Sequence, residues 1–180
     1  MKIAPQNPDA YWIHIAANAS THGHTAPWQF QMQMAALVGE QHQVVGSTVN
    51  FSSDGSDTTW SAVAVTDDGR LVKVVIVFNA ESYDLEQERS YREADPAYAV
   101  HEAWVRPLSD VIGIEVGKVG PRLNAFSQAR QGEFNVGDVR LRFADGGVVE
   151  LGFDQLAMPY QENRQNTDEL FAAIRAQTGL

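Results

Sequence analysis

Apolar and polar side chains alternate most regularly between residues 58 and 78. The first run, 58–66, places Trp60 and the alanines opposite serine and valine, and a β-branched run follows over 71–78. Asp68-Gly69 lies between the two runs, and an Asp-Gly pair in this position is typical of a hairpin turn. The pattern therefore predicts a β-hairpin over 58–78.

The same arrangement recurs over 137–153. Val139, Leu141 and Phe143 alternate with arginines, and Asp145-Gly146-Gly147 supplies residues that tolerate a positive φ. One apolar and one polar face are typical of an antiparallel sheet with one solvated side. Three further strands are expected from shorter β-branched runs, at 43–51, 109–117 and 125–136.

The C-terminal residues predict an amphipathic helix over 167–178. Asn166 and Glu169 have capping-box spacing, which indicates a helix start at this point. Gly179 is expected to end the helix. The apolar stripe, free to cover a sheet, consists of Leu170, Phe171 and Ile174.

The N-terminal residues 1–42 are expected to form a helical extension. The segment 9–19 favours a short helix. The segment 27–42 leaves two interpretations open, because its apolar residues alternate with glutamines as in a strand but also fall on one helical face. Pro27 suits a first helical turn, and Met, Gln, Ala and Leu are good helix formers, so helix is favoured.

Composition and charge exclude several classes of function. The 180 residues suit a single domain, and the absence of cysteine excludes disulfides, thiolate metal sites and cysteine nucleophiles. The formal net charge of −10, without a local basic stripe, argues against nucleic-acid binding and against an anionic membrane surface. The N-terminus lacks the apolar run of a signal peptide, so a cytoplasmic location is expected.

Taken together, the predicted elements resemble a known superfold. "AVTDDGRLVKVVIVF", "PLSDVIGIEV", "VRLRFADGGVVELGF" and "TDELFAAIRAQ" resemble the strands and closing helix of the pleckstrin-homology-like superfold in its bacterial form, over residues 43–180. The resemblance implies an α+β, mainly antiparallel protein: a barrel or sandwich of two nearly orthogonal sheets, with the C-terminal helix plugging one open end. The residues 1–42 would extend this framework.

The resemblance also bears on ligands. Relatives that bind phosphoinositides place lysines and arginines around the first hairpin loop, whereas this chain has Asp67-Asp68-Gly69 there, with Arg70 and Lys73 nearby. We therefore expect no phosphoinositide binding. The superfold leaves a scaffold for protein contacts, since a fold by itself does not specify a function.

The motif "THGHTAPW" is the first candidate for chemistry. His22 and His24 flank a glycine, but a zinc or nickel site needs three or four ligands and this stretch offers two. We interpret the pair as part of a solvated loop and expect neither a metal nor a cofactor. The chain also has no phosphate-cradling glycine loop and no nucleophile elbow.

The acidic segment 79–104 is the second candidate. It carries seven carboxylates against two arginines and is long for a connection between strands. Aromatic residues framed by charge suit a recognition surface, and the candidate partner-binding residues are Tyr83, Tyr91, Tyr98 and Trp104. The alternative is a short solvated helix at 82–93 whose tyrosines pack on the sheet.

Two functional hypotheses follow. The first is a non-enzymatic protein-binding or regulatory module that acts through a protein partner or through self-association. The alternative is a small enzyme or ligand binder, with a pocket between the N-terminal segment and the sheet that His22, His24 and Trp28 could line.

Overall fold

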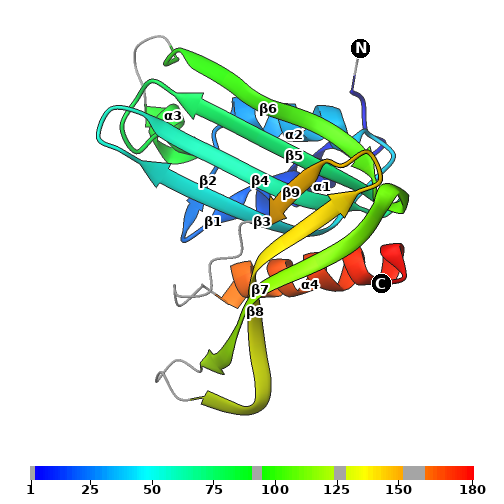
Figure 1. Ribbon diagram of the computed structural model, residues 1–180. Helices are drawn as coiled ribbons and strands as arrows, with labels where there is room; N and C mark the ends of the chain where they lie inside the picture. Colours follow the sequence, from blue (N-terminus) through cyan, green and yellow to red (C-terminus); the bar gives the residue numbers. More distant parts are fainter. Residues whose placement is uncertain (1–2, 91–94, 124–128, 152–160) are drawn as a thin grey trace.

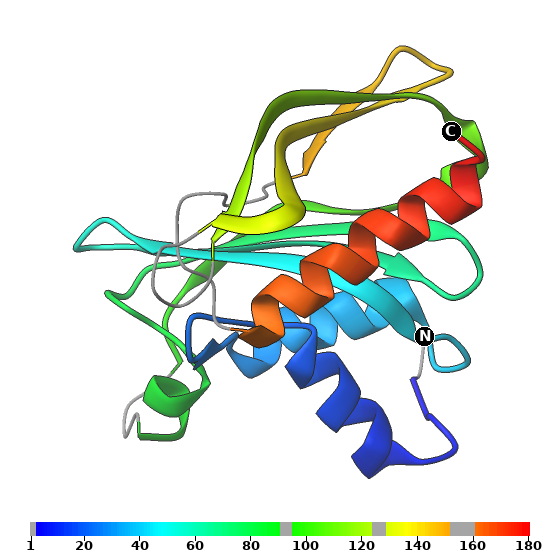
Figure 2. The same cartoon turned by 90° about the horizontal axis from the view of Figure 1, so that it is seen from below.

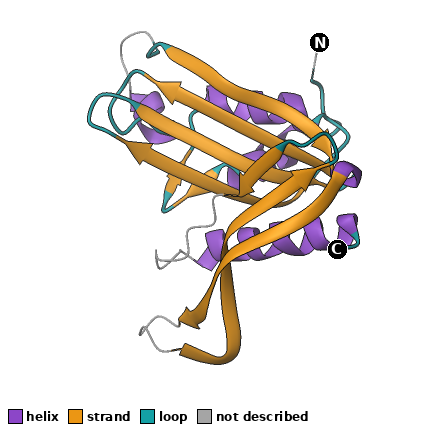
Figure 3. Ribbon diagram, in the orientation of Figure 1, coloured by secondary structure: helices purple, strands orange, loops and turns teal. Residues whose placement is uncertain are grey.

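The computed structural model describes residues 3–90, 95–123, 129–151 and 161–180. It is an α+β structure in which both larger sheets are antiparallel (Figure 3). The helices are α1 (Pro8–Ala17), α2 (Trp28–Val38), α3 (Leu85–Ser90), a 3-10 turn η1 (Leu108–Asp110) and α4 (Gln161–Thr178). The strands are β1 (Ser20–Thr21), β2 (His24–Thr25), β3 (Val44–Ser53), β4 (Thr58–Thr66), β5 (Arg70–Phe78), β6 (Tyr98–Pro107), β7 (Val111–Leu123), β8 (Ala129–Phe143) and β9 (Val148–Leu151).

The first sheet contains four strands in the order β3-β4-β5-β6 (Figure 1). The Asp-Gly hairpin is confirmed: β4 pairs with β5, and Gly69 adopts a φ of +79° in the turn. Arg70 follows this turn and donates hydrogen bonds to the carbonyl oxygens of Leu37 and Val38, the last residues of α2. An arginine side chain thereby satisfies carbonyls that the end of a helix leaves without partners.

The second sheet contains three strands in the order β7-β8-β9. The predicted hairpin over 137–153 is confirmed by the pairing of β8 with β9, which ends at Leu151. The predicted strand at 125–136 is not a separate element where the structure describes it, because β8 runs without interruption from Ala129 to Phe143. Residues 124–128 of that prediction, and Phe153 of the hairpin, lie outside the described residues.

The four-stranded sheet has an apolar core on each face, and Figure 2 shows that other elements cover both faces. Trp60 and Ile76 belong to the first core, which α1 and α2 cover. Val63 and Leu71 point to the opposite face and belong to the second core, which the three-stranded sheet and α4 cover. The strands of the three-stranded sheet cross those of the four-stranded sheet at a large angle (Figure 1).

The N-terminal extension is helical, as predicted, and the ambiguity at 27–42 is resolved in favour of a helix, α2. The alternation of its apolar residues with glutamines does not make a strand because Phe30, Met34 and Val38 form one fully buried helical face. Between the two helices, β1 and β2 form a minimal hairpin whose turn residues, His22 and Gly23, both have positive φ.

The C-terminal helix α4 begins earlier than predicted. Asn166 lies inside the helix, so the prediction that it caps the N-terminus is wrong. Leu170 and Ile174 are completely buried in the second core, and Phe171 packs against it while partly exposed. Gly179 ends the helix with a φ of +68°, as expected.

Gly46 on β3 sets how closely α4 approaches the sheet. A methyl group at this position would overlap the backbone nitrogen and Cα of Leu170. The closest approach of helix to strand is therefore possible only for a residue without a side chain. Figure 2 shows α4 running across β3 in this region.

Candidate functional site

The four predicted partner-binding residues have different environments. Tyr83 is only 1% exposed and packs against Phe78 in the first core, so its side chain is not accessible to a partner. This matches the alternative in which the tyrosines of a short helical segment pack on the sheet. Tyr98 is exposed on β6, Trp104 is half-buried on the same strand, and Tyr91 lies outside the described residues.

The acidic segment around α3 is tied to the N-terminal extension by its carboxylates. Asp84 accepts hydrogen bonds from the N–H groups of Glu86 and Gln87 at the start of α3, and its other oxygen lies 2.6 Å from Nδ1 of His24. Glu88 accepts a hydrogen bond of 2.8 Å from the N–H of Trp28, the first residue of α2. Burial raises the pKa of Glu88, although this hydrogen bond opposes the increase.

His24 therefore has a structural role. Its ring stacks on Phe51 at 4.8 Å between centroids, in addition to its contact with Asp84. Among the described residues, His22 and His24 belong to no group of three candidate metal ligands. Trp28, which follows them closely in the sequence, packs against Trp12, with 4.3 Å between the ring centroids and the ring planes tilted by 48°.

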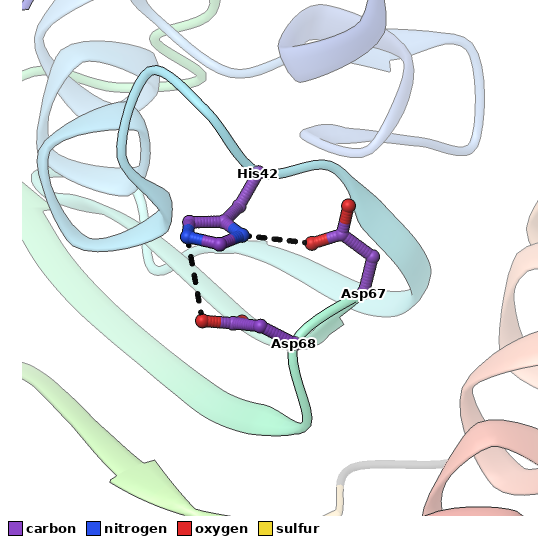
Figure 4. A group of neighbouring side chains, drawn as sticks. All are labelled: His42, Asp67 and Asp68. Carbon is purple, nitrogen blue, oxygen red and sulfur yellow. Dashed lines mark hydrogen bonds and ion pairs between the residues drawn. The ribbon is translucent and has the colours of Figure 1, made fainter.

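A different histidine lies among carboxylates at the other end of the sheet. Nδ1 of His42 is 3.1 Å from Asp67, and its Nε2 is 3.5 Å from Asp68 (Figure 4). Burial by itself would raise the pKa of Asp68, but hydrogen bonds from Thr66 and Arg70, together with the charge of Arg70, hold this pKa below its usual value. The same Asp68 oxygen that faces His42 accepts the Arg70 Nε hydrogen bond at 2.6 Å. This arrangement joins the α2–β3 loop to the β4–β5 turn.

A cavity of about 760 Å³ opens next to this cluster. The N-terminal segment and α1 form one wall, with Asn7, Tyr11 and His14, and the α2–β3 loop forms the other, with Glu40 and His42. His22, His24 and Trp28 do not line it. This cavity lies between the N-terminal segment and the α2–β3 loop, and not between that segment and the sheet as the alternative hypothesis expected.

Strand β6 forms one edge of the four-stranded sheet. It pairs with β5 on one side, and among the described residues no strand pairs with its other side. Its exposed apolar side chains are those of Tyr98, Val100 and Val105, with exposed fractions of 46%, 44% and 38%. The sequence pattern does not predict this strand, because most of it lies in the segment 79–104, whose acidic composition is typical of a connection.

The exposed β6 residues continue the surface of the first core. Tyr98 lies opposite Phe78, Val100 opposite Ile76, and Val105 opposite Val72. Directly opposed residues of an antiparallel pair point to the same face of the sheet. The β5 partners are all buried in the first core, so β6 extends that apolar face to the solvent.

The opposite face of β6 is polar and engaged. Glu102 accepts hydrogen bonds from Lys73 and from Nε1 of Trp104. Arg106 stacks over the ring of Phe143 and forms an ion pair with Asp145, so it connects β6 to the three-stranded sheet. The two faces of one edge strand thus differ in character.

Within the described residues, no helix combines the length and the apolar character needed to cross a bilayer. Comparisons of the chain with protein families, with curated protein sequences and with solved structures find no match.

Proposed function

We propose that this protein is a non-enzymatic protein-binding module of pleckstrin-homology-like architecture, and that a partner polypeptide binds along β6. Four strands followed by three strands and a C-terminal helix support the architectural part of the proposal. The observation that carries the functional part is the ten-residue edge strand β6, with apolar side chains exposed on the face that continues the first core.

The geometry of β6 favours strand addition by the partner. An edge strand presents backbone N–H and C=O groups that a second extended segment can pair with. A strand added there would lie beside Tyr98, Val100 and Val105. Its own alternate side chains would then cover the apolar surface that α1 and α2 leave exposed.

Charge indicates the kind of segment that fits. The start of β6 follows the acidic segment, where Glu81, Glu86 and Asp95 are exposed, and the whole chain has a net charge of −10. A segment with apolar residues on one face and basic residues near the Tyr98 end is complementary to this surface. Complementary charge speeds encounter and selects partners more than it adds affinity.

The proposal is tested by cross-linking the 180-residue chain to proteins of its native cell extract. Mass spectrometry then locates the cross-linked positions. We expect cross-links on β6 that are lost in Val100→Lys and kept in Val148→Lys, a matched control on β9 where the valine is also exposed. Cross-links that persist in Val100→Lys, or that map elsewhere, would refute binding along β6.

A further inference from the structure

The cavity between the N-terminal segment and the α2–β3 loop is separate from β6, and both polar and apolar groups line it. Its volume of about 760 Å³ falls within the range of small-molecule sites. Hydrogen bonds connect its two walls. The Ala4 N–H donates a hydrogen bond of 2.6 Å to Glu40, and the Tyr11 hydroxyl donates to the carbonyl oxygens of Ala35 and Gly39 at the end of α2.

The hydrogen-bonding groups around the cavity have defined roles. The Nε2 atom of His14 accepts the Val44 N–H, so the neutral ring carries its proton on Nδ1 and can donate it. The Tyr11 oxygen donates its own proton to the backbone and therefore offers lone pairs. The Glu40 carboxylate also accepts.

The charge of the site is negative. Glu40 is the one carboxylate in the lining, and among the described lining residues there is no lysine or arginine. Behind His42 lie Asp67 and Asp68. The nearby Arg70 is already engaged by Asp68 and by the last carbonyls of α2.

We infer that this cavity binds a small organic cation that carries both an amine and an oxygen acceptor. The amine would donate hydrogen bonds to the Glu40 carboxylate and the Tyr11 oxygen. The oxygen acceptor of the ligand would accept a hydrogen bond from the Nδ1–H group of His14. The N-terminus of α1 adjoins the cavity at Asn7 and would favour an anion instead. The charge of the ligand is therefore the property to test.

Three probes with the same number of chain carbons separate the charge classes: 4-amino-1-butanol, 1,4-butanediol and 4-hydroxybutanoate. Each is titrated into the full chain, and amide shifts are followed by NMR. We expect saturation by the amino alcohol with a dissociation constant of about 1–10 mM, as suits a ligand of six heavy atoms. The shifts should concentrate at Ala10, Tyr11, Gln41 and Gln43, which line the cavity.

A matched pair of variants locates the charge. Glu40→Gln keeps an oxygen that can accept the Ala4 N–H but removes the charge, and should weaken the amino alcohol about tenfold, the scale of one charge-assisted hydrogen bond. Glu81→Gln removes an exposed carboxylate at the opposite end of the sheet and should leave binding unchanged. Failure of the amino alcohol to saturate, equal or stronger binding of either other probe, or undiminished binding by Glu40→Gln would each overturn the inference.

Discussion

Strands β3 and β6 are the two edges of one sheet and have the same length, but their environments are opposite. Half of β3 is buried: Val44 and then Gly46 to Val49, where α4 crosses it. No residue of β6 is buried. Natural sheets protect exposed edges with bulges, charges and proline, and β6 has a bulge at His101, a partly exposed ion pair at Glu102 and Pro107 at its end.

The comparison shows two ways in which a sheet can tolerate an edge. At β3 the C-terminal helix covers the strand, so substitutions there act on folding. At β6, α2 approaches the apolar face but leaves Tyr98, Val100 and Val105 exposed. The opposite face is connected to the three-stranded sheet through Arg106. Substitutions on the exposed face should therefore affect binding and leave folding unchanged. Substitutions at the two edges test that difference.

Among substitutions that introduce no charge, the largest effect is expected at Gly46. Replacement by alanine places a methyl group where it overlaps the backbone of Leu170 in α4. This backbone cannot move without displacing the helix from the second core. We expect the free energy of unfolding to fall by about 3 kcal/mol or more, which is at the upper end for overpacked sites. Denaturant unfolding measures it. Gly113→Ala on β7 is the control, because a Cβ there meets only ordinary contacts, and equal losses in both would contradict the proposed packing.

The next largest loss of stability is expected at Ile174, on the helix that covers β3. It is completely buried between α4 and the sheets. Ile174→Ala removes apolar contacts and leaves a cavity, so we expect a cost of about 2–5 kcal/mol in thermal or denaturant unfolding. Phe171→Ala should cost less, because this ring is partly exposed. A larger loss for Phe171 than for Ile174 would reverse the assignment of the buried face.

The same contrast explains which elements could be predicted from sequence. The hairpin over 58–78 has a regular alternation and an Asp-Gly turn, and both survive in the structure. In β6 the bulge shifts the alternation of side chains between the two faces by one residue. Tyr98 and Val100 therefore share a face with Val105, because His101 is the extra residue between them. A period-two pattern cannot reveal a strand whose period is interrupted, so β6 was hidden in the acidic connection.

The candidate site was predictable only in part. Tyr98 is exposed on β6, where partner binding stays a prediction. Tyr83 is buried, because its carbonyl accepts the Trp60 indole N–H and its ring packs on Phe78. The cavity and the His42 cluster could not be predicted, since their members are far apart in sequence. Asp67 lies 25 residues after His42, and only pairing between β3 and β4 brings them together.

An intermediate effect is expected from the ion pair on the engaged face of β6. The hydrogen bond and charge of Lys73 hold the pKa of Glu102 below its usual value, although burial opposes them. An unfolded glutamate titrates at about pH 4.3. Because the folded pKa is lower, the stabilisation is present above that pH and is lost as the pH falls through the folded value.

Carboxyl NMR titration measures this pKa directly. We expect Lys73→Ala to return the Glu102 pKa toward its ordinary value and to reduce the acid sensitivity of unfolding. The change in stability at neutral pH should be less than about 1 kcal/mol, because the pair is partly exposed. The control is Lys118→Ala, which removes an exposed ion pair with Asp138 on the other sheet. A Glu102 pKa that is unchanged in Lys73→Ala would show that the pair does not form in solution.

The smallest effect on folding is expected at Val100, and it is the most informative about β6. Val49 on β3 and Val100 on β6 are valines on opposite edges of one sheet, with exposed fractions of 8% and 44%. Val49→Lys would bury a charge in the first core and should prevent stable folding, since an uncompensated buried charge is among the costliest substitutions. Val100→Lys places the charge in solvent and should change the free energy of unfolding by no more than about 0.5 kcal/mol. Thermal melts of the two variants decide the point. A strongly destabilised Val100→Lys protein would mean that β6 is already covered in solution, by another copy or by the chain itself, and the edge would then be unavailable to a partner.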